Sequence, residues 1–362
     1  MGQRLSEQEQ AFVQAIEAEP DKEELKLIYA DWLEEQGNPR SELLRLLCQV
    51  SGLYGPLGVC AALPFAEPKT RIENILYQFC NNLLDELGDG SKTAVLMALQ
   101  IAENILAAAQ QGVDVRLGEP CLVIADRVAN WLIDLAEPPS SIHDLEFLAL
   151  TAARGNGDIA HAMVESIEIA GPKGIIAVLP AKTKNGTNAV WCERPRKRLF
   201  FGNGKNQPDI HFHVVGETLE KAQKFEILAI NCMHSTRDYI ATGGVAGGGA
   251  AYLRCANRLK QQTDLGFSDW AVHAMAAGLT RPVQSLAQTA AVSSTEVMAR
   301  LSSDEHMVFD LHNKQYQPFR HAAPRDPAGF AASSVRHSTA AAIQLVRENV
   351  TAFSQSRQIP SI

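Results

Sequence analysis

The hydrophobic and polar positions of residues 5–50 follow a helical period, and this pattern predicts three short helices. A capping sequence at residues 6–9, Ser-Glu-Gln-Glu, opens the first helix, and Pro20 ends it. A second apolar stripe runs to Gly37, and the leucines that follow it form the third helix. We therefore expect residues 1–50 to be a compact helical module.

A longer apolar run follows a glycine-rich loop. The loop is Gly88-Asp-Gly-Ser-Lys-Thr93, and the Ala-rich run from Ala94 to Gln111 ends before Gly112. Two glycines allow a positive φ and a close approach to a ligand, and a helix N-terminus with unpaired N–H groups attracts phosphate. The carboxylate of Asp89 is suited to the Mg²⁺ that accompanies a nucleotide. An ordinary loop with a good N-cap explains the same hexapeptide, so both interpretations stay open.

The remaining pattern predicts a mainly helical chain with a few strands. Residues 51–70 are rich in Gly and Pro and form a linker or loop, and a helix over 71–87 leads to the glycine-rich loop. A helix is expected over 122–135, and strands over 175–179 and 210–215. A mainly α fold with a small α/β part follows.

Composition and charge narrow the class of protein. The 362 residues suffice for two or three domains, and the net charge of −8 argues against general binding of nucleic acid. No run approaches the about 20 apolar residues that span a bilayer, and the first ten residues lack the apolar core of a signal peptide. The seven cysteines are scattered and never form C-x-x-C, which indicates reduced thiols. We expect a cytoplasmic protein without a membrane segment.

Two further patterns carry candidate chemistry. The basic stretch 194–198, beside Trp191, suits an acidic partner or nucleic acid. A solvent-exposed hairpin tip explains the same residues. His211 and His213 fall on one face of the second predicted strand, because side chains two apart along a strand point the same way. A metal pair and a polar strand face both explain them, and the sequence shows no third ligand.

The N-terminal segment also resembles a known small module. The stretch over residues 12–21 and the sequence Tyr-Ala-Asp-Trp-Leu-Glu-Glu at 29–35 are similar to the repeat-companion domain at the N-termini of many planctomycete proteins. The resemblance implies an accessory module that contacts a protein partner.

Five stretches farther along the chain occur in the order that one known family shows: residues 88–98, 171–178, 234–254, 308–316 and 325–327. Together they resemble the nucleotide loop, the entry into the intermediate domain, the return helix with its triple-glycine loop, and the closing segment of the group I chaperonins, the GroEL-like family. The resemblance implies a mainly α chain in which an equatorial-like helical bundle is interrupted by a small α/β intermediate-like domain. The implied domains are 1–50, 51–150, 151–232 and 233–362.

The same resemblance implies a site for ATP or ADP with Mg²⁺. It places Asp89 as the metal ligand, and Lys92 stands where the family has Thr. The implied binding residues are Gly55 and Pro56 in a first phosphate loop, Asp89, Gly90, Ser91, Lys92 and Thr93 in the second, Gly248 and Gly249 in the triple-glycine loop, and Asp326 near the ribose.

The departures from the family concern catalysis and client binding. Asn231 stands at a catalytic Asp of the family, and an amide cannot act as a general base. About thirty residues follow the first strand where the family inserts its apical domain, fewer than the about 50 of a small domain. We therefore expect a degenerate chaperonin-related protein with weak or lost hydrolysis and no client capture, which forms homo-oligomers or assembles with chaperonin subunits. The alternative is a non-enzymatic scaffold that uses the fold for subunit contacts.

Overall fold

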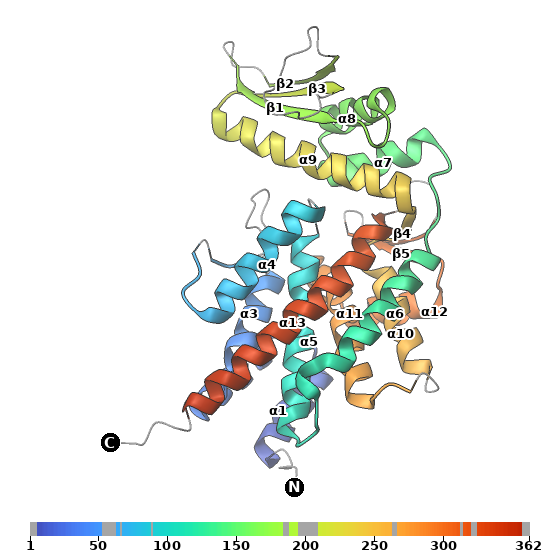
Figure 1. The fold of residues 1–362 in the computed structure, drawn as a ribbon. Helices are drawn as coiled ribbons and strands as arrows, with labels where there is room; N and C mark the ends of the chain where they lie inside the picture. The colour runs from blue at the N-terminus through green and yellow to red at the C-terminus, as the bar shows by residue number, and fades with distance from the viewer. Residues whose placement is uncertain are drawn as a thin grey trace.

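Helix α5 (Ser91–Gln110) runs through the middle of the larger part of the molecule (Figure 1). Most of its apolar side chains are buried, and it packs against α3 (Arg40–Gly52), α11 (Asp269–Thr289) and α13 (Ala328–Ser356). The helix predicted after the glycine-rich loop is confirmed. By length and composition α5 could cross a bilayer, but 61% of its apolar window is buried inside the fold, as in the core helix of a soluble protein.

The computed structural model describes most of the chain, namely residues 6–52, 63–65, 67–87, 90–183, 188–194, 209–262, 266–311, 314–319 and 324–356. Within these stretches the bundle around α5 is completed by further helices and two small antiparallel ladders, as the pattern of a mainly α fold predicts. These elements are α4 (Arg71–Leu87), the 3-10 turn η1 (Arg116–Gly118), α6 (Glu119–Asp134), α10 (Ala250–Gln261), α12 (Ser294–Ser303), β4 (Gly244–Ala246) paired with β7 (Arg325–Pro327), and β5 (Met307–Asp310) paired with β6 (Gln315–Pro318).

The N-terminal segment forms the three predicted helices, α1 (Glu7–Ala18), α2 (Glu23–Glu35) and α3. The Ser6 hydroxyl accepts the Glu9 N–H at 3.1 Å, which is the predicted cap. Leu43, Leu46 and Leu47 of α3 lie in the same core as α5, whereas Leu44 packs with residues of α2 in a separate small cluster. The buried Arg40 guanidinium donates to the carboxylate of Glu103 on α5. The N-terminal helices therefore contact the bundle through α3, and their role as an accessory module stays a prediction.

A small α/β unit packs above one end of the bundle (Figure 1). Its sheet has the order β1-β3-β2, with β3 parallel to β1 and antiparallel to β2. The helices lie against one face of the sheet, and the buried residues of β3 alternate with half-buried ones, so among the described residues this sheet has one packed and one open face. The elements are α7 (Ile142–Ala152), α8 (Gly157–Ala170), β1 (Ile176–Lys182), β2 (Ala189–Glu193), β3 (Ile210–Gly216) and α9 (Leu219–Thr242).

The long helix α9 connects this unit to the bundle. Its Asp238 carboxylate accepts the Phe330 N–H at 2.8 Å, and its Thr242 hydroxyl accepts the Gly329 N–H at 2.9 Å, so α9 caps the first turn of α13. The domain limits expected at 150 and 232 fall inside α7 and α9. Residues of both helices lie in the hydrophobic core of the α/β unit.

Candidate functional site

A pocket of about 410 Å³ opens where the N-terminal ends of α5 and α10 meet β7 and the first turns of α13. This volume lies in the range of about 300–1,000 Å³ that small-molecule sites occupy. The described residues that line it are Gly90, Lys92, Thr93 and Leu96 from α5 and its N-cap, Ser235 from α9, Gly248, Gly249 and Tyr252 around the start of α10, Pro282, Ser285, Leu286 and Thr289 from α11, Asp326 and Pro327 from β7, and Phe330, Ala331 and Ser334 from α13.

Six of the residues predicted from the sequence line this one pocket: Gly90, Lys92, Thr93, Gly248, Gly249 and Asp326. They come from three stretches of sequence that lie far apart, so the fold is what brings them together. Ser91 is the first residue of α5 but does not line the pocket. The predicted residues Gly55, Pro56 and Asp89 lie outside the described residues.

Two helix N-termini open onto the pocket. The N-cap residues Gly90 of α5 and Gly249 of α10 have left-handed φ angles of 83° and 78°, and neither residue has a side chain to cap the helix. Among the described residues of both first turns there is no acidic side chain. The partial positive charge at these ends is therefore not offset by an acidic side chain of the helices' own first turns, which favours an anion.

Gly249 also allows two helices to approach each other closely. A Cβ atom at this position would lie 2.8 Å from Val283 Cγ2 and 3.0 Å from the Val283 backbone nitrogen on α11. Gly247 is similar, because a Cβ there would lie 2.7 Å from the Arg325 nitrogen. The glycine-rich run thus provides the close packing that holds α10 against α11 and β7.

Two cationic side chains contact Ser51 of α3: Lys92, which also lines the pocket, and Arg281. The Lys92 ammonium donates to the Ser51 carbonyl at 3.3 Å, and the Arg281 guanidinium, on a residue that is only 2% exposed, donates to the Ser51 hydroxyl. Both therefore contact the C-terminal turn of α3, where the helix dipole favours positive charge. Burial, with a smaller effect of Arg281, lowers the pKa of Lys92 to about 8. Sequence reasoning missed Arg281, whose signal is an arginine followed by Pro282 inside an amphipathic helix.

The carboxylates of the site are few. Asp326 is the one carboxylate among the described residues that line the pocket, and it lies on β7 opposite Val245 of β4. Asn231 lies on α9, is 7% exposed, and stands one turn before Ser235, which lines the pocket. Because positions four apart share a helix face, the position expected to carry the catalytic carboxylate is on the pocket side of α9 but carries an amide.

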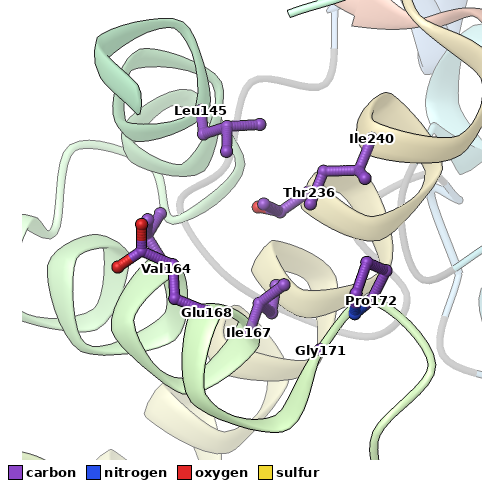
Figure 2. Close-up of a pocket in the computed structure, with 8 residues that line it drawn as sticks. All are labelled: Leu145, Val164, Ile167, Glu168, Gly171, Pro172, Thr236 and Ile240. Atoms are coloured by element: carbon purple, nitrogen blue, oxygen red, sulfur yellow. The ribbon is translucent and has the colours of Figure 1, made fainter. Parts of the chain in front are cut away.

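A second, smaller hollow of about 200 Å³ lies between α7, α8 and α9. Figure 2 shows that Leu145 and Ile240 approach it from opposite helices, with Thr236 beside them and Glu168 at its edge. Its lining is mainly aliphatic and lacks the converging N–H groups and cations of the larger pocket. We therefore take the larger pocket as the candidate site.

Three other sequence predictions concern the cysteines, the basic stretch 194–198 and the two histidines of β3. The six described cysteines do not form disulfides with one another, and Cys60 lies outside the described residues, so the reduced state stays a prediction. Most of the basic stretch 194–198 also lies outside them, so its two interpretations stay open. His211 and His213 do share one face of β3.

Comparison with known proteins places this fold among the chaperonins. The chain is similar to a solved structure described as a group III chaperonin in the open state, with a TM-score of 0.66 and 12% sequence identity over 85% of this chain and 97% of that chain. At this identity the similarity shows the fold alone.

Residues 186–351 match the TCP-1/cpn60 chaperonin family. Over 124 residues the chain is 27% identical to heat shock protein 60A of Drosophila melanogaster, covering 32% of this chain. It spans about a fifth of the length of that relative, 21%. The chain is thus similar to chaperonins over part of its sequence and in its fold, whereas membership of group I, the missing apical domain and the repeat-companion module stay predictions.

Proposed function

We propose that this protein binds ATP or ADP with Mg²⁺ in the pocket between α5, α10 and β7, and that it hydrolyses the nucleotide slowly or not at all. The observation that carries the proposal is the convergence of the predicted residues, from Gly90 to Asp326, on one pocket at two glycine-capped helix N-termini. The phosphates would lie against these N-termini with Lys92 nearby, and the Asp326 carboxylate would accept hydrogen bonds from the ribose hydroxyls. Asp89 would hold the Mg²⁺, as the resemblance implies.

Slow hydrolysis follows from the residue types at the site. A general base must accept a proton from the attacking water, and Asn231 cannot do so. The charge of a bound metal ion would still orient the phosphates. The protein would therefore hold a nucleotide as a ligand that sets its conformation or assembly.

The proposal extends to assembly and location. We propose a homo-oligomer or a co-assembly with chaperonin subunits, a protein partner for the N-terminal helices, no capture of clients through an apical domain, and a cytoplasmic location. The rival proposal is a non-enzymatic scaffold that keeps the fold for subunit contacts and binds no nucleotide. Asn231 argues against hydrolysis, which both proposals expect to be weak or absent. The two proposals differ in whether the protein binds nucleotide, so a binding measurement discriminates between them.

The pH dependence of binding tests the role of Lys92. Because the folded protein lowers the pKa of this lysine to about 8, its ammonium loses its proton as the pH rises through that value, and the attraction to phosphate is lost. We expect the affinity for Mg-ATP to fall above pH 8 by up to about tenfold per pH unit. Titration of a fluorescent ATP analogue at a series of pH values measures this.

The control for this experiment is Lys92→Thr, which introduces the residue of the chaperonin pattern. The variant should bind more weakly at neutral pH and show a flatter pH profile. A wild-type affinity that is constant between neutral pH and pH 9, or the same slope in both proteins, would exclude Lys92 as a phosphate contact.

A further inference from the structure

Three side chains with metal-binding atoms lie together on the small sheet, outside the pocket. Glu193 of β2 and His211 and His213 of β3 each offer one ligand atom, and these atoms lie within 4.8 Å of one another. The buried residues of β3, which alternate with the histidines, belong to the core that includes α8 and α9. The histidines therefore point to the opposite, open face of the sheet.

The third ligand comes from strand register. β2 is antiparallel to β3, and the pairing sets Glu193 opposite His211 and Trp191 opposite His213. Directly opposite residues share one face of a sheet, so the carboxylate is brought beside both imidazoles. The sequence spacing of His211 and His213 could not reveal this neighbour, because the register of β2 depends on the folded sheet.

The geometry of the three side chains suits one small cation. The His213 Nε2 atom lies 3.2 Å from the Glu193 Oε1 atom. The His213 ring stacks on the Trp191 ring, with the ring centroids 4.7 Å apart, which fixes its orientation. The plane of the His211 ring lies at 87° to that of His213. Donors about 2.0–2.2 Å from a tetrahedral zinc ion stand about 3.3–3.6 Å apart, so the His213–Glu193 side of the triangle, at 3.2 Å, is close to this length.

We propose that Glu193, His211 and His213 bind a zinc ion. Two imidazole nitrogens and one carboxylate oxygen are the donor set of three-ligand zinc sites, and the exposure of Glu193 leaves the fourth position open to water. The ion would join β2, an edge strand whose one neighbour in the described sheet is β3, to the rest of the sheet. The site is independent of the nucleotide pocket.

A cross-strand His–Glu hydrogen bond is the simpler interpretation of two of these residues. It accounts for Glu193 and His213 but not for a second imidazole within 4.8 Å of the same atoms. The pair of His337 and Glu86, with 3.4 Å between nitrogen and oxygen, shows the simple arrangement elsewhere in the molecule. It provides the matched control.

Isothermal titration of the chelator-treated full chain with ZnCl₂ tests the site. We expect one zinc ion per chain, with the affinity lowered at least about tenfold in His211→Ala, His213→Ala and Glu193→Gln, and unchanged in His337→Ala. Circular dichroism of each variant verifies that it is folded. An affinity that is the same in the wild type and in both histidine variants, or no zinc binding by the folded wild type, would overturn the proposal.

Cobalt provides a second measurement that reports the position of the ion. Co²⁺ bound by these ligands should give the visible absorption of a four-coordinate ion and should quench the fluorescence of Trp191, which lies against His213. In Trp191→Phe the quenching should disappear while the visible absorption stays. Absorption that survives in His211→Ala and His213→Ala would place the ion elsewhere and contradict the assignment.

Discussion

Replacing Arg40 with alanine is expected to lower the free energy of unfolding by about 3–5 kcal/mol, because it leaves a buried carboxylate without its counter-charge. The Arg40 side chain is 4% exposed and contacts the carboxylates of Glu103 and Glu9. It also donates to the Gln110 side-chain oxygen at 2.6 Å. Urea unfolding followed by circular dichroism measures the change.

Arg45 provides the matched control for this variant. It contacts the carboxylates of Asp31 and Glu34, which are 67% and 63% exposed. Exposed pairs contribute about 0–1 kcal/mol, so Arg45→Ala should change stability by no more than that. Replacing both Arg40 and Glu103 with methionine should recover part of the loss, since the buried Glu103 carboxylate is then removed together with its counter-charge, and Glu9 keeps the hydrogen bond from Tyr29. Equal losses for Arg40→Ala and Arg45→Ala would show that the buried pair does not join α3 to α5.

Gly249→Ala is expected to destabilise the protein by about 2–5 kcal/mol and to weaken nucleotide binding. The new methyl group would meet Val283 at 2.8 Å, and the residue would be held at a φ of 78°. Left-handed backbone costs a non-glycine residue about 1–2 kcal/mol, and overpacking adds about 1–3 kcal/mol. Because Gly249 is the N-cap of α10, the shift that relieves the contact would move that helix end away from the phosphates.

Gly155→Ala separates the two contributions. Gly155 has a φ of 81°, and a Cβ atom added to it would meet no other atom within 4 Å, so alanine there introduces backbone strain without a clash. We expect a loss of about 1–2 kcal/mol and an unchanged nucleotide affinity. If Gly249→Ala were no more destabilising than Gly155→Ala, the close packing of α10 on α11 would not be what requires this glycine.

The helices could be predicted because their signals are local. The Ser6 cap, the stop at Gly37 and the glycine loop before α5 each involve neighbours in sequence, and the structure shows helices beginning or ending at these places. The approach of Gly90 and Asp326 to one pocket was predicted through family resemblance, since no local pattern connects residues so far apart.

The parts that could not be predicted depend on tertiary contacts. The partner of Arg40 is 63 residues away, and the amphipathic pattern of α3 does not reveal which core receives it. The burial of Arg281 depends on its contact with Ser51, 230 residues away. Glu193 joins the histidines only through the register of β2 on β3. Each is a pairing of charged or polar groups that the folded chain creates.

Equilibrium titration of the full chain with a fluorescent ATP analogue in the presence of Mg²⁺ tests the central claim most directly. We predict saturable binding below millimolar nucleotide, weakened about tenfold or more by Asp89→Ala, which corresponds to about 1.4 kcal/mol. Asp114→Ala, which removes a carboxylate that is 84% exposed, should leave the affinity unchanged. No binding at millimolar nucleotide, or binding that Asp89→Ala does not alter, would contradict the account and favour the scaffold.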